Sequence, residues 1–302
     1  MRRRVLSGLL ESRSMDLIGR PAAPLALFVR CYVQLEIRLR GQPVVLPIPA
    51  RSAPILHFTL GDPHEVLFTE HAGHEVAHAC NVVGVQTYRR GLLSMRGNID
   101  TFTVIFQPGG LSALLAVPGD TLTNRHFDGR AVCGAWVDDL RSRLGASSSF
   151  AERVRHADQC LLRRRPTASA HQGVAEAAGS LLARSGSLRI AGLVEQSGLS
   201  SRQFERRFAA HVGMSAKLFA RVVRFEAALK RKKQAPGLRW TDVAHELGYS
   251  DQMHMVHDFS LLAGATPAAV APKLDIIVQE EVDHTGEPAQ PPERVSIHPL
   301  LT

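Results

Sequence analysis

The C-terminal half of the chain contains an internal near-repeat. Residues 193–200, LVEQSGLS, are matched 50 residues later by residues 243–250, VAHELGYS. In both copies a helical pattern ends at a glycine, which suits the left-handed conformation just past a helix end. The segments that follow align at an offset of 51, which pairs Phe208 with Phe259. Two short helices joined by a glycine turn form a helix-turn-helix, and the sequence predicts this unit twice.

Each unit has the signals of a well-defined second helix. In the first, Ser200 is placed to cap the helix, and the residue three positions later, Gln203, completes a capping box. In the second, the carboxylate of Asp251 is placed at a helix N-terminus, where the helix dipole favours negative charge. Apolar residues at helical spacing form the inward faces, namely Phe204, Phe208 and Val212 in the first helix and Met255, Phe259 and Leu262 in the second.

The side chains left facing outward are the candidates for contact with DNA bases. They are Ser201, Arg202, Glu205 and Arg206 on the first helix, and Gln252, Met253, Val256 and His257 on the second. Arginine makes paired hydrogen bonds with guanine in the major groove, so Arg202 and Arg206 are the strongest candidates. Helix caps and basic residues near the helices are the candidates for the DNA backbone, namely Ser200, Arg221, Arg224 and Asp251.

A continuous helical pattern over residues 216–233 connects the two units. At about 1.5 Å per residue this helix is roughly 27 Å long. Successive major-groove faces of a duplex are about 34 Å apart, so such a connector could hold two recognition helices on one side of DNA.

Charge is concentrated in the same region. Residues 184–273 contain 14 Lys and Arg against 7 Asp and Glu, whereas residues 274–302 contain 1 against 6. A basic surface attracts polyanions such as nucleic acid. The acidic, proline-rich residues 274–302 have the composition of a disordered tail.

The N-terminal half reads as short strands separated by turns, as in a β-sandwich or a cupin-like barrel. A stripe at helical spacing, Val132, Trp136, Leu140 and Leu144, predicts a helix that closes this domain. The predicted fold class is therefore multidomain, with a mainly-β domain and closing helices at 1–163 and an all-α domain at 171–273. A linker is predicted at 164–170, and the two helix-turn-helix units at 190–211 and 241–262.

The C-terminal segments resemble a known family. Residues 193–213 (LVEQSGLSSRQFERRFAAHVG), 224–229 (RFEAAL) and 242–267 (DVAHELGYSDQMHMVHDFSLLAGATP) resemble the DNA-binding domain of AraC/XylS-type transcription regulators. The residues Phe106-Gln107-Pro108-Gly109-Gly110 and Leu122-Thr123-Asn124 resemble the sensor-like domain of some members. The resemblance implies that the partner is double-stranded DNA. It also implies that the N-terminal domain binds a small-molecule effector or a second copy of the chain, and that the protein contacts RNA polymerase if it activates transcription.

The second unit departs from this family pattern. Where the family usually has Ser or Ala, then His-Phe-x-Arg, this chain has Met253-His254-Met255-Val256-His257. An imidazole therefore stands in place of the arginine, so the first unit is the better candidate for direct base readout.

One other motif suggests different chemistry. His74-Glu75-Val76-Ala77-His78 matches the zinc-protease pattern, which needs a helix and a third ligand. The alternative hypothesis is therefore a metal-dependent hydrolase or cupin-like enzyme fused to a DNA-binding domain, and the sequence leaves open whether His71, His74 and His78 bind a metal. The preferred interpretation is a non-enzymatic regulator without a cofactor, since two helix-turn-helix units outweigh one five-residue pattern. A cytoplasmic location is expected, because no membrane-length apolar run is present and the four widely spaced cysteines fit a reducing compartment.

Overall fold

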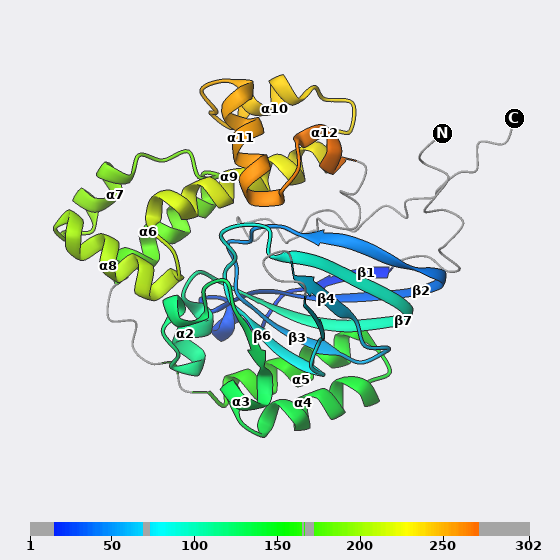
Figure 1. Ribbon diagram of the computed structural model, residues 1–302. Helices are drawn as coiled ribbons and strands as arrows, with labels where there is room; N and C mark the ends of the chain where they lie inside the picture. Colours follow the sequence, from blue (N-terminus) through cyan, green and yellow to red (C-terminus); the bar gives the residue numbers. More distant parts are fainter. Residues whose placement is uncertain (1–14, 69–72, 165, 167–171, 272–302) are drawn as a thin grey trace, which may run out of the picture.

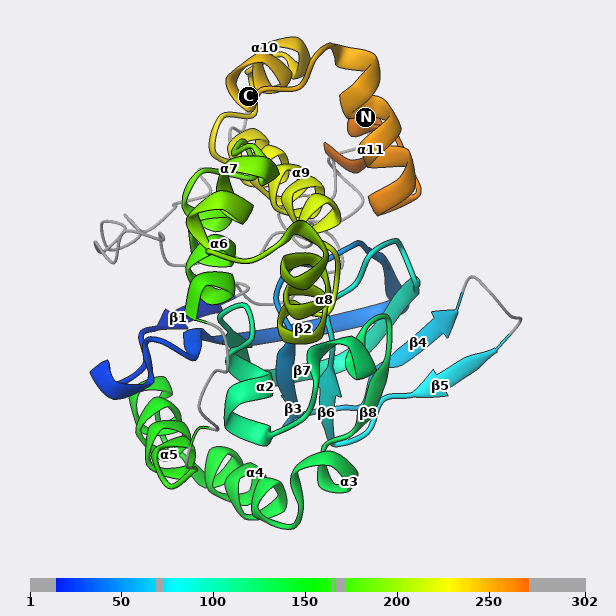
Figure 2. The same cartoon turned by 90° about the vertical axis from the view of Figure 1, so that its left-hand side faces the viewer.

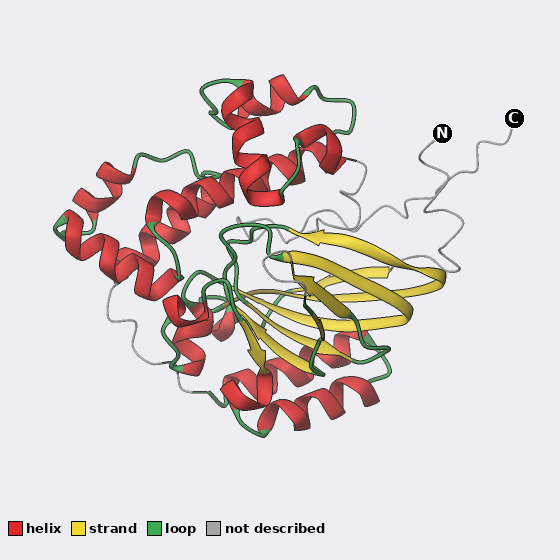
Figure 3. Cartoon of the chain, viewed as in Figure 1, coloured by secondary structure: helices red, strands yellow, loops and turns green. Residues whose placement is uncertain are grey.

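The structure is a computed structural model that describes residues 15–68, 73–164, 166 and 172–271. A strand-rich N-terminal part is followed by an all-helical C-terminal part, as the sequence predicts (Figure 3). The predicted tail 274–302 and most of the predicted linker 164–170 lie outside the described residues. No helix in the described ranges is long and apolar enough to span a bilayer.

In the described part of the chain, eight strands form one sheet in which every pairing is antiparallel. The order is β1-β2-β7-β3-β6-β8, and β4 pairs with both β5 and β7. The strands are β1 Met15–Gly19, β2 Val29–Ile48, β3 Ile55–Thr59, β4 Glu65–Phe68, β5 His74–Val76, β6 Cys80–Val83, β7 Gly91–Phe106 and β8 His126–Asp128. The mainly-β fold class is confirmed, and one continuous, strongly curved sheet is nearer to the predicted barrel than to the predicted sandwich (Figure 1).

Side chains along β7 point alternately into the core and into a cavity, as the two-residue period of a strand requires. Phe102 and Phe106 are fully buried in the core between the sheet and the helices of the N-terminal part. Thr101 and Thr103 face the opposite way and line the cavity. Each fully buried phenylalanine contributes about 1.5–3 kcal/mol, so one face of the sheet supplies stability and the other is free to bind.

Short helices cover the apolar face of the sheet (Figure 2). They are the 3-10 helices η1 Ala23–Leu25 and η2 Gly119–Leu122, and the α-helices α2 Gly110–Leu115, α3 Gly129–Cys133, α4 Trp136–Ala146 and α5 Phe150–Leu162. The predicted closing helices are present, and the stripe is divided between two of them, because Gly134 adopts a positive φ of 86° and separates Val132 in α3 from Leu140 in α4.

The C-terminal helices pack around a core of phenylalanines. They are α6 Gln172–Ala183, α7 Ile190–Gln196, α8 Ser201–Val212, α9 Ala216–Gln234, α10 Trp240–Glu246, α11 Gln252–Ala263 and α12 Pro267–Val270. Phe208 contacts Phe219 at 5.7 Å between ring centroids, and Phe225 contacts Phe259 at 4.9 Å. The connector α9 contributes a ring to each contact, so it joins the two helix-turn-helix units into one core.

Candidate nucleic-acid interface and pocket

The first helix-turn-helix consists of α7 and α8. Gly198 has the positive φ of 67° that the turn requires. The predicted capping box is confirmed: the hydroxyl of Ser200 accepts from the backbone N–H of Gln203, and the Gln203 side chain accepts from the Ser200 N–H. The inward face is also confirmed, since Phe204, Phe208 and Val212 are buried.

The outward residues of α8 form a polar, basic face. Ser201, Arg202 and Arg206 are exposed, and Glu205 is partly exposed. All four lie in the first two turns of the helix, the part of a recognition helix that meets base edges. The C-terminal end of α8 instead lies against the N-terminal domain (Figure 2).

The second helix-turn-helix consists of α10 and α11, and Gly248 (φ 70°) lies in its turn. As predicted, Asp251 caps α11: its carboxylate accepts from the backbone N–H of His254 at 2.7 Å. This hydrogen bond is the main reason that the pKa of Asp251 lies below its usual value. The inward face of Met255, Phe259 and Leu262 is buried, as predicted.

The outward residues of α11 differ in chemistry from those of α8. Gln252 and His257 are exposed, Val256 is partly exposed, and the thioether side chain of Met253 is 72% exposed. No lysine or arginine occurs between Gln252 and Ala263. The two units therefore share a scaffold and present different surfaces.

The connector α9 matches the predicted helix to within one residue at its end. Arg221 on α9 donates to the fully buried carboxylate of Asp258 on α11 at 2.6 Å. Arg224 donates to the Gly186 carbonyl at 2.8 Å and lies over the ring of Tyr249. These contacts join parts of the same domain and do not test contact with DNA. The assignment of Arg221 and Arg224 to DNA phosphates therefore stays a prediction, as does that of Ser200 and Asp251.

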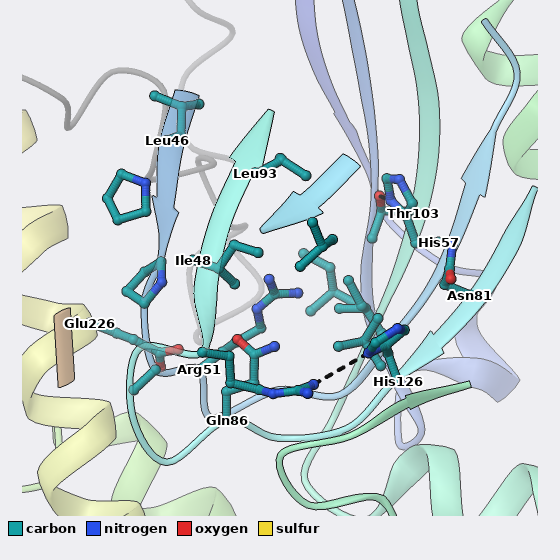
Figure 4. Close-up of a pocket in the computed structure, with 18 of the residues that line it drawn as sticks. Leu46, Ile48, Arg51, His57, Asn81, Gln86, Leu93, Thr103, His126 and Glu226 are labelled. Carbon is teal, nitrogen blue, oxygen red and sulfur yellow. Dashed lines mark hydrogen bonds between the residues drawn. The ribbon is translucent and has the colours of Figure 1, made fainter. Parts of the chain in front are cut away.

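A cavity of about 510 Å³ lies between the concave face of the sheet and helix α9 (Figure 4). One part of its wall is apolar, with Leu46, Val66, Leu93 and Met95. Another part is polar, with His57, Asn81, Gln86, Thr103 and His126. Four cations and two carboxylates also line the cavity, namely Arg30, Arg51, Arg90 and Lys230, and Glu75 and Glu226.

His57 is a neutral group in this wall. Burial, followed by the nearby charges of His64 and Arg51, lowers the pKa of His57 to about 3. Its Nδ1 lies 2.8 Å from the hydroxyl of Thr103, which fixes the ring plane. The imidazole therefore adds a polar ring without a positive charge to the wall at neutral pH.

One segment of the N-terminal domain, residues 84–90, reaches both recognition helices at equivalent positions. Gly213 ends α8 and Gly264 ends α11, and both have positive φ. A Cβ at Gly213 would lie 2.7 Å from Val85, and one at Gly264 would lie 2.6 Å from Nε of Arg89. Gln86 and Arg90 of the same segment line the cavity, so the segment lies between the cavity and the ends of both helices.

Further contacts fix this arrangement. The backbone N–H of Ala50 donates to the Leu262 carbonyl at 2.7 Å. Ser52 donates twice to Glu226 on α9, from its N–H at 2.8 Å and from its hydroxyl at 2.5 Å. The Thr123 hydroxyl donates to the Gly213 carbonyl. Val85 and Ala50 are buried in the same core as the C-terminal helices, so the two domains share part of a core.

The zinc-protease pattern does not form its expected structure. His74, Glu75 and Val76 form strand β5, which places neighbouring side chains on opposite faces instead of on one helical face. Glu75 contacts Nε2 of His126 at 3.1 Å and of His78 at 3.6 Å. Among the described residues no group of three such side chains is arranged to hold a metal ion, and His71 lies outside that range.

Comparison with known domains divides the chain in the same way. Residues 193–272 match the model of a helix-turn-helix domain, and residues 19–128 match a domain of unknown function, DUF6597. The C-terminal domain is an AraC-type helix-turn-helix domain, which confirms the resemblance seen in the sequence. The chain thus has a strand-rich domain followed by a helix-turn-helix domain. No curated protein is similar in sequence.

Solved structures with a related arrangement are remote in sequence. ToxT from Vibrio cholerae O395 is 8% identical, with a TM-score of 0.47, over 80% of this chain and 98% of that chain. An unsaturated fatty acid-bound ToxT from V. cholerae strain SCE256 is 7% identical, with a TM-score of 0.48, over 86% and 95%. The AraC-like transcriptional activator CuxR is 11% identical, with a TM-score of 0.26, over 68% and 77%.

Apart from Glu75, which belongs to the zinc-protease pattern, the pocket residues and the segment 84–90 were not predicted from the sequence. The one available signal was the presence of polar residues at alternate positions of buried strands, as in Thr101 and Thr103. That pattern does not reveal which strands curl around a shared cavity.

Proposed function

We propose that this protein is a sequence-specific DNA-binding transcription regulator whose two recognition helices enter successive major grooves. The observation that carries the proposal is the pair of capped helices α8 and α11, which present Arg202, Arg206, Gln252 and Met253 to solvent on one rigid connector. Cytoplasm, where DNA is accessible, is the expected location.

Full-length protein is the right material for the test, because Ala50 and Val85 of the N-terminal domain are buried in the core of the helical domain. A duplex enriched from a random pool is titrated with the protein by fluorescence anisotropy at several salt concentrations. Binding should weaken steeply with salt, since each neutralised phosphate releases counterions. The proposal fails if no duplex is enriched, or if affinity does not depend on salt.

A matched substitution separates specific contact from net charge. Arg202→Ala should weaken binding and relax specificity at one base pair. Arg130→Ala removes the same charge from an exposed residue of the N-terminal domain, paired with Asp138, and should leave affinity nearly unchanged. Equal losses in the two variants would mean that charge alone, and not base contact, explains binding.

We further propose that the cavity binds a small-molecule effector with an apolar body and a polar or anionic end. Its volume lies within the usual range for ligand sites, and such sites are apolar with a few polar groups. The four cations of the wall outnumber its two carboxylates, which favours an anionic group. The contacts of residues 84–90 with α8 and α11 give such a ligand a route to the DNA-binding helices.

Thermal unfolding with three ten-carbon probes tests this second proposal. Decanoate, decanol and decylamine share an apolar body, and a ligand that binds the folded state raises the midpoint by mass action. Decanoate should stabilise most and decylamine least, and Leu93→Trp, which fills the cavity, should remove the difference. Equal effects of the three probes, or none, would contradict an anion-preferring site.

Two further expectations concern protein partners. We expect a second copy of the chain to bind through the N-terminal domain, which light scattering of the purified protein tests. We also expect contact with RNA polymerase if the protein is an activator.

A further inference from the structure

The second recognition helix carries a surface that its counterpart lacks. In the alignment of the two units, Gln252 corresponds to Ser201, Met253 to Arg202, Val256 to Glu205 and His257 to Arg206. Every charged position of this set on α8 is therefore replaced on α11 by an apolar group or an imidazole. Met253 is 72% exposed, and among the described residues it is one of six large hydrophobic side chains that are exposed.

These replacements match one part of the major-groove code. Adenine offers an acceptor and a donor that a glutamine amide pairs with, and thymine offers a methyl group that apolar side chains contact. Guanine is read mainly by arginine or lysine, and α11 has neither. Gln252 and Met253 are neighbours at the start of the helix, and Val256 lies one turn further on the same side as Met253.

The helix is held rigidly enough to present these groups. Asp251 caps its first turn, and the buried carboxylate of Asp258 binds Arg221 on the connector. Met255 and Phe259 anchor the opposite face in the core. The backbone at Met253 and Val256 is therefore held in place, while the Met253 side chain is exposed and the Val256 side chain is partly exposed, as base reading requires.

We propose that α11 reads A·T base pairs, with Gln252 hydrogen-bonding to adenine and with Met253 and Val256 packing against thymine methyl groups. The operator then consists of two unlike boxes, one containing guanine that α8 contacts and one rich in A·T that α11 contacts. This inference rests on the proposed function, because it assigns the bases that a DNA-binding α11 would select.

The test replaces thymine by deoxyuridine, which removes the methyl group and leaves base pairing intact. Duplexes are first enriched from a random pool with full-length protein, and then again with Arg202→Ala and with Met253→Ala, to assign each box to its helix. Loss of one methyl contact should weaken wild-type binding roughly fourfold, as expected for one buried carbon group. Met253→Ala should lose most of this deoxyuridine effect, whereas Arg202→Ala should keep it.

Gln252→Ala provides a second readout, since it should reduce the preference for A·T over G·C in the same box while the other box is unchanged. All three side chains are exposed, so the variants should unfold at the same temperature as the wild type. A G·C box for α11, or an unchanged affinity with deoxyuridine, would overturn this inference and leave DNA binding intact. Failure to enrich any duplex would instead overturn the proposed function and this inference with it.

Discussion

Helices α8 and α11 have the same length, a side-chain cap at the N-terminus and a left-handed glycine at the C-terminus, and each buries an apolar face. Their outer faces differ: α8 contains three arginines, and α11 contains none. Their anchors differ too, since Arg207 of α8 aligns with Asp258, the carboxylate that fixes α11 to the connector. The comparison teaches that packing and recognition are set by different faces of a helix, so one scaffold can serve two kinds of base readout.

The largest expected effect comes from breaking the anchor that only the second unit has. Arg221→Met should leave the buried Asp258 carboxylate without its partner and destabilise the protein by about 3–5 kcal/mol, measured by denaturant unfolding. The exposed pair of Arg231 with Glu246 is the control, and Arg231→Met should change stability little. Equal stability of both variants would show that the buried pair does not anchor α11.

A second effect concerns base readout by the first unit. Arg202→Ala or Arg206→Ala should cost about 1–3 kcal/mol of binding free energy, as a lost paired contact with guanine does. His257→Ala, at the position equivalent to Arg206, should cost less, because one imidazole cannot form the paired contact. Anisotropy titrations with one enriched duplex make the comparison, and a larger loss for His257→Ala would reverse the assigned division of roles.

The third effect compares the glycines that end the two helices. Both need positive φ, so alanine at either costs about 1–2 kcal/mol in strain. Gly213→Ala should cost more than Gly264→Ala, because its methyl group meets Val85 and the Gly119 backbone, whereas at Gly264 it meets the flexible side chain of Arg89. Thermal unfolding of the two variants gives the order directly, and the reverse order would contradict the described contact between the domains.

The smallest effect is a pH dependence confined to the second unit. The pKa of the Asp251 carboxyl is lower in the folded protein than in the unfolded chain, where it is about 3.8. The cap therefore stabilises α11 fully at pH values above the unfolded pKa, and this stabilisation is lost as the pH falls through the folded pKa. Ser200, which caps α8, has no such titration. Hydrogen exchange should show α11 opening before α8 as acid is added, and Asp251→Asn should remove the difference. Simultaneous opening in the wild type would exclude this asymmetry.

The helical domain was predictable because its signals are local. Ser200, Gln203 and Asp251 act on backbone groups within three residues, and Phe204, Phe208 and Val212 follow the helical period. The base-reading candidates follow from that period alone, and they remain predictions.

The N-terminal domain was less predictable because its determinants are distant in sequence. β7 pairs with β2, β3 and β4, and the cavity exists only once these pairings curl the sheet. A composition of Val, Ile and Thr predicts strands but not their register. The ion pair of Arg221 with Asp258 likewise joins residues 37 positions apart, which no helical period reveals.

The central claim is that α8 and α11 bind one DNA duplex together. Footprinting of full-length protein on an enriched duplex, repeated with Arg202→Ala and with Met253→Ala, tests it most directly. Connector α9 is about 28 Å long, so two protected boxes should lie roughly one helical turn apart on one face of the DNA. Each substitution should weaken protection mainly in its own box. A single protected box, or two boxes weakened equally by both substitutions, would contradict the account.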